Sequence, residues 1–301
     1  MTASMSKVLI TGGSGRLGRH VCDELSSANE ITVFDRVAPA EGIPTILGDV
    51  TDLAALECAA RGRDAIIHLA AIPSPRHGSL QEIFTTNTVG TWNVLQAARS
   101  GGVKRVIICS TDFVTGLPHQ PASASPLYLP IDEDHPLRPA EVYGLSKQLA
   151  ETIGHSFALC GIEVVILRLA LVVFPQTQLA AMKAAEDISD PDLWWHVEAV
   201  DAARAFRLAL ERPVAGTDTF FIGSASTLSS MPTLVLVERR YGRLPEIRDR
   251  ELYRRNPYAA LFDVRHARDV LGFTPAERRH TEPHGRTHQP APAGDSSETV
   301  K

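Results

Sequence analysis

Short apolar runs alternate with amphipathic stretches along more than half of the chain. Residues 8–10 form a β-branched apolar run that is typical of a buried strand, and residues 16–25 carry apolar side chains at helical spacing. Further strands are predicted at residues 31–35, 45–50, 65–71, 105–110 and 163–169. Helices are predicted after Thr51, which is a suitable N-cap, and at residues 80–101 and 141–159. This alternation predicts an α/β fold with a doubly wound parallel sheet.

The pattern is less regular after the fifth strand. Residues 117–139 are a proline-rich loop, which either covers a site or runs over the surface. A helix is expected at about residues 200–211, a strand at 219–223 and an amphipathic helix at 231–241. Residues 246–256 are charge-rich and are expected to be solvated, and the composition of residues 277–301 predicts a disordered tail.

A glycine-rich turn joins the first strand to the first helix. Gly12, Gly15 and Gly18 fit the pattern G-x-x-G-x-x-G, and Gly13 with the last two also fits G-x-G-x-x-G. Unpaired N–H groups and the helix dipole attract an anion to such a helix N-terminus. Glycines permit the tight turn, the close approach of a pyrophosphate and the packing of helix on strand. The turn therefore predicts a dinucleotide site, to which Arg16 and Leu17 also belong.

Acidic residues follow the next two strands. Asp35 stands near the offset of ~20 residues at which a carboxylate hydrogen-bonds the adenosine ribose. A carboxylate repels a 2′-phosphate, so Asp35 favours NAD over NADP. Arg36 works against this, because a guanidinium beside the ribose accepts such a phosphate. Asp49 is placed to reach the adenine edge, and the small residues near Ala70 allow a backbone to lie against the cofactor.

Tyr143 and Lys147 stand four apart at the start of a predicted helix, so they share one face. A tyrosine has a reference pKa of about 10 and needs help to act as an acid or base near neutral pH. A lysine ammonium one turn away favours the phenolate. Thr111, at the end of the fifth strand, offers a hydroxyl for the substrate oxygen. Considered by itself, such a pair would be interpreted as an ordinary surface Tyr and Lys. In a chain that also carries the glycine turn, the pair predicts a catalytic site.

Composition and charge narrow the class of protein. The chain has 301 residues, is 44% hydrophobic and 22% charged, and carries a net charge of −5. This charge gives no basic field for nucleic acid or for an anionic membrane. Apolar runs are too short to cross a bilayer, and residues 1–6 are too short and polar for a signal peptide. The four cysteines are scattered, which predicts reduced packing residues in a cytoplasmic protein.

Some residues allow both a structural and a functional interpretation. His68 lies within a predicted strand and is expected to be buried rather than catalytic. Trp194 and Trp195 are suited to stacking on a sugar, but packing under the following helix is favoured. Three histidines repeat every fourth residue in the tail, at His280, His284 and His288. Proline and glycine interrupt that repeat, so no metal site is expected.

Taken in order, these motifs resemble an extended short-chain dehydrogenase/reductase of the NAD-dependent epimerase/dehydratase type. The resemblance is carried by TGGSGRLG at residues 11–18, Asp35, GDV at 48–50, HLAA at 68–71, NTVGTWNVL at 87–95, Ser110-Thr111, YGLSK at 143–147, LRL at 167–169, HVEAVDAARA at 196–205 and FDVRHARDVLGFTP at 262–275. It implies a Rossmann-type NAD(P)-binding domain over residues 1–175 and a small substrate-binding part over residues 176–276, interleaved with the Rossmann core.

The resemblance also implies roles for single residues. Thr111 is the expected catalytic hydroxyl, Tyr143 the acid/base, Lys147 the ribose anchor that lowers the tyrosine pKa, and Asn87 the asparagine that supports the site. The expected cofactor-binding residues are Gly12, Gly15, Arg16, Leu17, Gly18, Asp35, Arg36, Asp49, Val50, Leu69, Ala70, Ala71, Ser110, Tyr143, Lys147 and Leu169. A homodimer packed through the helices at residues 80–101 and 143–159 is also implied.

The substrate is the open question. Residues 168–171 read RLAL where nucleotide-sugar enzymes of this family often read R-P-x-N, and Thr115 replaces a common tyrosine. Lys183 is the only basic residue within residues 176–195, where a diphosphate needs a cation or a helix N-terminus. We therefore expect an NAD-dependent oxidoreductase that moves a hydride to or from a secondary alcohol or carbonyl of a free sugar, a sugar acid or a small metabolite.

Two alternatives remain at this stage. One is a nucleotide-sugar epimerase or dehydratase with tightly bound NAD; a dehydratase needs an acid beside the catalytic hydroxyl, and Asp112 follows Thr111. The other is a non-catalytic NAD-sensing or scaffold protein, a class that tends to lose the catalytic tyrosine or lysine. Both residues are present in this chain, at positions 143 and 147.

Overall fold

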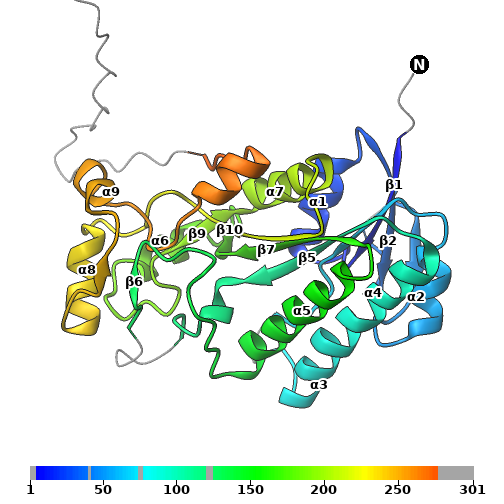
Figure 1. The fold of residues 1–301 in the computed structure, drawn as a ribbon, viewed down its shortest axis with the longest axis horizontal. Coiled ribbons are helices and arrows are strands. Elements are labelled where there is room, and N and C mark those ends of the chain that lie inside the picture. Colours follow the sequence, from blue (N-terminus) through cyan, green and yellow to red (C-terminus); the bar gives the residue numbers. More distant parts are fainter. Residues whose placement is uncertain (1–4, 40–41, 74–76, 120–124, 277–301) are drawn as a thin grey trace, which may run out of the picture.

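A parallel β-sheet forms the centre of the molecule (Figure 1). The structure is a computed structural model that describes residues 5–39, 42–73, 77–119 and 125–276. Within them, seven strands pair in the order β10-β7-β5-β4-β1-β2-β3, all parallel. They are β1 (Ser6–Thr11), β2 (Asn29–Asp35), β3 (Thr45–Leu47), β4 (Ala65–His68), β5 (Arg105–Thr111), β7 (Glu163–Leu169) and β10 (Thr217–Ile222). The predicted doubly wound α/β fold is confirmed.

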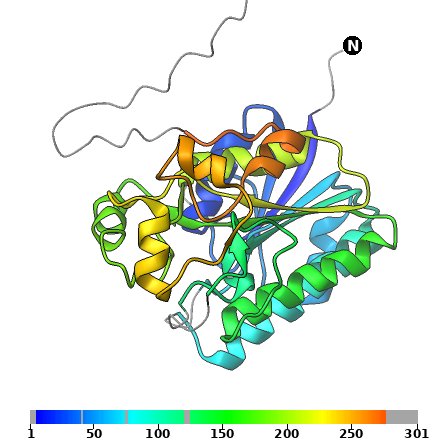
Figure 2. The same ribbon diagram turned by 60° about the vertical axis from the view of Figure 1, so that its left-hand side comes forward.

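Helices cover both faces of the sheet (Figures 1 and 2). On one face lie α1 (Arg16–Leu25) and α7 (Ala199–Glu211); on the other lie α2 (Leu53–Ala60), α4 (Gly90–Gly101) and α5 (Val142–Ala158). Because successive strand residues point to opposite faces, Val8 and Ile10 pack under the first pair of helices and Leu9 under the other three. Burial on both faces explains the unbroken apolar run that marks the first strand.

The helix predicted at residues 80–101 has the expected span but not a uniform geometry. It consists of α3 (Leu80–Phe84), a π-helical turn η1 (Thr85–Val89) and α4. Ser79 caps its start, with its hydroxyl accepting from the N–H of Glu82 and its own N–H donating to the Glu82 carboxylate. The wider π turn places Asn87 with its side chain buried behind the site.

Smaller elements surround the carboxyl end of the sheet. β6 (Tyr128–Leu129) pairs with β11 (Glu246–Ile247), and β8 (Leu171–Val173) pairs with β9 (His196–Glu198). The others are η2 (Asp112–Thr115), α6 (Gln178–Ala184), α8 (Thr233–Tyr241), α9 (Arg250–Arg255) and η3 (Ala267–Leu271). Figure 1 shows α8, α9 and β6 grouped on one side of the molecule. In contrast, β10 from the same half of the chain belongs to the central sheet, and α7 belongs to the helices that cover it.

Several sequence-based details are wrong. Asp52, not Thr51, caps α2, because its carboxylate accepts from the N–H of Ala55. Cys58 and Cys160 are exposed and do not pack in the core. The third and fourth strands are shorter than expected, ending at residues 47 and 68. Two other expectations hold: β6 in the proline-rich loop lies outside the central sheet, and within the charge-rich residues 246–256, which contain β11 and α9, only Tyr253 is buried.

Burial confirms the structural interpretation of the adjacent tryptophans. Trp194 and Trp195 are 1% and 0% exposed. The ring of Trp195 stacks on Phe262 at 4.3 Å and lies against Gly223, where any Cβ would collide with the indole. These rings therefore belong to the core. The predicted tail at residues 277–301, with its three histidines, lies outside the described residues.

The described residues contain no cluster of His, Cys, Asp and Glu suited to a metal ion. In the same part of the chain, no helix is long and apolar enough to span a membrane.

Candidate active site

A cavity of about 1170 Å³ opens along the carboxyl ends of the parallel strands. It runs from the glycine turn and the end of β2 to the start of α5, and Thr111 with every predicted cofactor position lines it. Carboxyl ends of strands are where ligands bind in open α/β sheets. The residues that the sequence placed at these strand ends are therefore brought together in one cavity.

The glycine turn makes room for a pyrophosphate. Gly12 has a φ of 75°, and a Cβ there would lie 2.5 Å from the backbone nitrogen of Ala70. At Gly18 a Cβ would collide with the carbonyl oxygen of Gly12, so only glycine lets α1 pack this closely. Gly15 is the N-cap of α1 and brings no side-chain cap, which leaves the first amides of the helix to a ligand. These residues fit a dinucleotide.

Asp35 is held in position by the backbone of the same turn. Its Oδ2 accepts a hydrogen bond from the N–H of Ser14 at 3.0 Å, and its Oδ1 accepts from Val37 at 3.4 Å. The Ser14 hydroxyl donates to the carbonyl of Val37 at 2.5 Å and ties the two segments together. Arg36 lines the cavity beside this carboxylate. The arrangement presents an anion at the ribose end of a dinucleotide site.

The start of α5 holds the predicted acid–base pair. Glu141 caps this helix, with its carboxylate accepting from the N–H of Tyr143 at 2.6 Å and also from that of Gly144. Lys147 lies one turn further on, and its Nζ donates to the carbonyl of Cys109 at 2.8 Å. Both side chains line the cavity, and the Lys147 ammonium is 6.0 Å from the centre of the Tyr143 ring. The cap and the strand end therefore orient the pair.

Burial dominates the electrostatics of these groups. Desolvation, with smaller effects from Cys109 and Asp112, raises the pKa of Tyr143, whereas a hydrogen bond from Thr111 lowers it. Desolvation also lowers the pKa of Lys147, against the raising influence of Cys109 and Glu151. The protein alone thus holds the tyrosine protonated. A further positive charge in the cavity would be needed to bring the phenolate toward neutral pH.

Two acids and a histidine line the cavity together with Tyr143, namely Asp112, Asp192 and His119. The sequence did not identify Asp192 or His119 as site residues. Asp112 accepts from the Thr111 hydroxyl at 3.1 Å, and burial together with the charge of Asp192 raises its pKa well above the usual range. His119 Nε2 lies 3.4 Å from Asp192, and its backbone N–H donates to Pro191 at 2.9 Å. Segments distant in the sequence make this wall, so no local pattern could have revealed it.

Phe174 was also missed by sequence reasoning. The guanidinium of Arg16 stacks over its ring at 3.9 Å, and the ring lines the cavity. Arg16 comes from the glycine turn, whereas Phe174 follows β8, so this contact joins the cofactor side to the substrate side.

Asn87 lies behind the cavity wall rather than in it. Its amide donates to the carbonyl of Ile72 at 3.1 Å and to the Ser146 hydroxyl at 3.0 Å, and its Oδ1 accepts from the N–H of Ile72. Asn87 therefore links the segment after β4 to α5, between Tyr143 and Lys147. Its supporting role stays a prediction.

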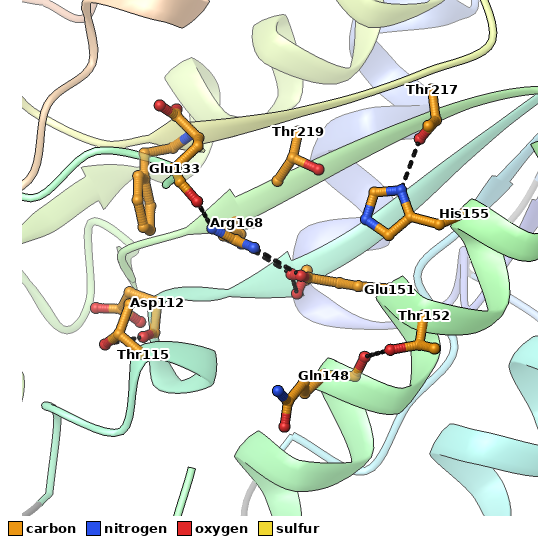
Figure 3. A network of polar contacts seen from close by, with 12 residues as sticks. Asp112, Thr115, Glu133, Gln148, Glu151, Thr152, His155, Arg168, Thr217 and Thr219 are labelled. Carbon is orange, nitrogen blue, oxygen red and sulfur yellow. Dashed lines mark hydrogen bonds and ion pairs between the residues drawn. The ribbon is translucent and has the colours of Figure 1, made fainter. Parts of the chain in front are cut away.

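A buried ion pair joins Arg168 to Glu151 (Figure 3). Arg168 on β7 donates to both carboxylate oxygens of Glu151 on α5, at 3.0 and 2.8 Å, and both side chains are almost fully buried. The Ser110 hydroxyl donates to the same carboxylate at 2.5 Å. The arginine of the RLAL segment is thus engaged inside the protein.

The comparisons with known proteins agree with this architecture. The profile of the NAD dependent epimerase/dehydratase family matches residues 8–223. The chain belongs to this family. Its fold is shared with a short-chain dehydrogenase/reductase superfamily protein from Agrobacterium tumefaciens solved with bound NAD, at a TM-score of 0.67 and 25% identity, over 90% of this chain and 93% of that one.

Curated relatives include sugar dehydrogenases. The chain is 29% identical to the L-arabinose 1-dehydrogenase (NAD(P)(+)) of Haloferax volcanii over 191 residues, which is 62% of this chain and 74% of the relative. It is 34% identical to the uronate dehydrogenase of Pseudomonas putida over 183 residues, which is 59% of this chain and 65% of the relative. The chain thus spans slightly less than two thirds of the uronate dehydrogenase.

Proposed function

We propose that the protein is an NAD-dependent dehydrogenase of a free sugar, with Tyr143 as acid/base. The observation that carries the proposal is the convergence of Tyr143, Lys147 and the Thr111 hydroxyl at one end of a cavity whose other end is the glycine turn and Asp35. Relatives that oxidise arabinose and uronates, and a similar structure with bound NAD, support the same reaction class. Bound NAD supplies the acceptor for the hydride that leaves the substrate carbon.

The protein's own residues manage the proton of the reacting hydroxyl. Tyr143 Oη takes that proton as the carbonyl forms. The Thr111 hydroxyl, which donates to Asp112 in this structure, turns to donate a hydrogen bond to the same substrate oxygen. The ammonium of Lys147 stabilises the phenolate of Tyr143. It is fixed for this task by the carbonyl of Cys109. In the opposite direction Tyr143 returns the proton to the alkoxide.

The wall of the reacting end favours a sugar without a diphosphate. Asp112 keeps its proton more readily than an ordinary aspartic acid and can donate to a sugar oxygen, while Asp192 accepts from a sugar hydroxyl. The negative charge of Asp192 on this wall repels the phosphates of a nucleotide sugar. His119, paired with Asp192, adds a donor on the same wall. These contacts are the basis for choosing a free sugar over a nucleotide sugar.

A substrate panel tests this proposal. L-Arabinose, other free aldoses, uronates and UDP-sugars are each incubated with NAD and, separately, with NADP, and the reduced cofactor is followed by its absorbance. We expect net NADH formation with a free aldose, and less with a uronate because of the acidic wall. Interconversion of a UDP-sugar without net NADH formation would contradict the proposal and favour an epimerase. Tight NAD binding with no turnover of any substrate would favour a sensing or scaffold role.

We further propose which part of the chain provides each half of the site, and that the chain forms a homodimer. Residues 1–175 provide the cofactor and acid–base groups, and residues 176–276 add the substrate wall around Asp192. A homodimer is supported by large apolar side chains that stay exposed on α3, η1, α4 and α5, namely Phe84, Val89, Trp92 and Leu145. Four free cysteines support a reducing, cytoplasmic location.

A further inference from the structure

Two neighbouring residues at the end of β5 bond two successive turns of α5. The carbonyl of Cys109 accepts from Lys147 and the hydroxyl of Ser110 donates to Glu151. The next residue of the strand, Thr111, lowers the pKa of Tyr143, one turn before Lys147. The three α5 side chains are spaced four residues apart and so share one face of that helix. These contacts hold the end of β5 and this face of α5 in one register. Of the three α5 side chains, Glu151 is the most buried.

Arg168 completes this arrangement from the neighbouring strand. It is the partner of Ser110 in the β5–β7 register, and its guanidinium binds Glu151 through two nitrogens. A third nitrogen donates to the carbonyl of Glu133 at 3.2 Å, and the Glu133 carboxylate accepts from the N–H of Phe221 on β10. Figure 3 shows Arg168 between Glu133 and Glu151. The ion pair thus has fixed geometry and satisfied hydrogen bonds, which a buried pair requires.

We propose that Glu151 and Arg168 are positioning residues for the acid–base pair: they hold α5 in register with β5 and keep the net charge beneath Lys147 close to zero. This inference rests on the proposed function of Tyr143 and Lys147. The negative charge of Glu151, one helical turn beyond Lys147, favours the ammonium and disfavours the phenolate. Arg168 offsets that charge. Removing Glu151 therefore shifts the pKa values of both Tyr143 and Lys147 in one direction, and removing Arg168 shifts both in the opposite direction.

Other ionisable groups also face Tyr143 and Lys147, and their charges must be the same in the variants that are compared. From the elements packed around Tyr143 and Lys147 these are His68 on β4, Cys109 on β5, Asp112 on η2, Glu141 at the cap of α5 and, beyond Arg168, Glu133. Among these groups Asp112 adjoins Thr111, and burial together with the charge of Asp192 raises its pKa. The experiment is therefore repeated in an Asp112→Asn background.

The test uses Glu151→Gln, Arg168→Gln and the double variant in the full chain. Removing the carboxylate lowers the pKa of both Tyr143 and Lys147, so both limbs of the pH profile of kcat/KM for oxidation move to lower pH, by about half a unit to one unit. Removing the guanidinium leaves the carboxylate unbalanced and moves both limbs to higher pH. The double variant returns the limbs to near the wild-type positions. Single variants that shift the profile in the same direction, or not at all, would overturn the charge-balancing role.

A binding measurement separates this inference from the proposed function. NAD⁺ carries a positive nicotinamide ring and NADH does not, so the ratio of their dissociation constants reports the charge in the cavity without any turnover. We expect the ratio Kd(NAD⁺)/Kd(NADH) to rise about threefold to tenfold in Glu151→Gln and to fall by a similar factor in Arg168→Gln. Unchanged ratios would overturn the inference. If these ratios shift while no sugar is oxidised, the electrostatic role stands and the proposed substrate reaction fails.

A milder variant covers the case in which the single variants do not fold. Ser110→Ala keeps both charges and removes the hydroxyl that ties Glu151 to β5. We expect kcat to fall about threefold to tenfold with KM for the sugar unchanged, because the loss of one hydrogen bond loosens the register of the catalytic groups. An unchanged kcat would overturn the positioning role. Thr152→Ala, which removes a hydroxyl from an exposed site on the same helix, is the matched control.

Discussion

At the residue scale, we propose that Asp35 sets the choice between NAD and NADP. Its carboxylate is oriented by the N–H groups of Ser14 and Val37, and these bonds leave the anion beside Arg36 at the ribose end of the cavity. A carboxylate accepts hydrogen bonds from two ribose hydroxyls and repels a 2′-phosphate. On this proposal, the preference for NAD depends on the charge of Asp35 more than on its shape.

Asp35→Asn keeps the shape and removes that charge. We expect kcat/KM with NAD to fall about tenfold, because charge-assisted hydrogen bonds to the ribose are lost. The preference for NAD over NADP should fall by at least as much, because the positive charge of Arg36 is no longer opposed by a carboxylate. Steady-state kinetics with both cofactors checks this. Asp49→Asn, further along the cavity, is the control and should change both cofactors alike. An unaltered preference in Asp35→Asn would refute this assignment.

Asp112 is a residue whose burial lowers stability at neutral pH. Its folded-state pKa lies above the unfolded value of 3.8, so its contribution to stability is complete below that value and is lost as the pH rises through the folded pKa. Asp112→Asn removes this loss. We expect the variant to be as stable as wild type near pH 4 and more stable than wild type at neutral pH.

Denaturant unfolding at a series of pH values measures this difference. Asp134→Asn, at an exposed position, is the matched control and should show no such gain. A difference between Asp112→Asn and wild type that stays constant with pH would show that the carboxyl does not titrate as described.

At the scale of elements, a chain of hydrogen bonds joins β1, β4 and the π-helical turn. The Thr91 hydroxyl donates to the carbonyl of Asn87 at 2.6 Å, so it must accept from Nε2–H of His68. Nδ1 of His68 is then an acceptor for the Thr11 hydroxyl at 2.7 Å. The directions of these bonds require a neutral imidazole. Burial, aided by the charge of Lys147, lowers the His68 pKa to about 3.

This chain predicts how stability changes in mild acid. The folded-state pKa of His68 is below the unfolded value of 6.5, so its contribution is complete above that value and is lost as the pH falls toward 3. We expect His68→Gln to be less stable at neutral pH by about 1–2 kcal/mol, from impaired hydrogen bonding, but to lose less stability on acidification. Thermal unfolding between pH 7 and 4 tests this, with the exposed His155→Gln as control. Equal acid sensitivity of His68→Gln and wild type would count against it.

The elements also show what could be predicted from sequence. The strand–turn–helix at residues 6–25 was predictable because its glycines and apolar residues act locally, and the order of strands and helices gave the sheet. The π turn around Asn87 was not predictable, because it depends on contacts with β4 and α5. The wall made by His119, Phe174 and Asp192 was missed for the same reason, since these side chains meet only after the chain has folded. On our proposal, this wall selects the substrate.

At the scale of the whole molecule, the exposed apolar side chains have a common location. Val89 and Trp92 on η1 and α4 are 41% and 49% exposed, and Leu145 on α5 is 41% exposed. The helices that carry them run side by side (Figure 2), and Trp92 contacts Phe157 of α5 at 5.2 Å. Such a surface on helices that also carry Tyr143 and Lys147 would couple assembly to the active site.

Trp92→Glu tests the proposed dimer. A charge at the centre of an apolar interface has a high desolvation cost, so we expect the variant to be monomeric at micromolar concentration, where the wild type is dimeric. Light scattering after size-exclusion chromatography measures the mass. Leu47→Glu, on the edge strand β3, is the control; Leu47 is 64% exposed, and its replacement should leave the mass unchanged. A wild-type protein that is already monomeric would refute the dimer directly.

The central claim is that Tyr143 carries the proton in an NAD-dependent oxidation. The most direct measurement compares Tyr143→Phe with wild type, following both NADH formation from the best sugar of the panel and the dissociation constant of NAD. We expect turnover to fall about a thousandfold while NAD affinity stays within about threefold, since only the phenolic oxygen is removed. Tyr128→Phe, whose hydroxyl bonds Asp132, should keep its turnover. Wild-type turnover in Tyr143→Phe would contradict the assignment.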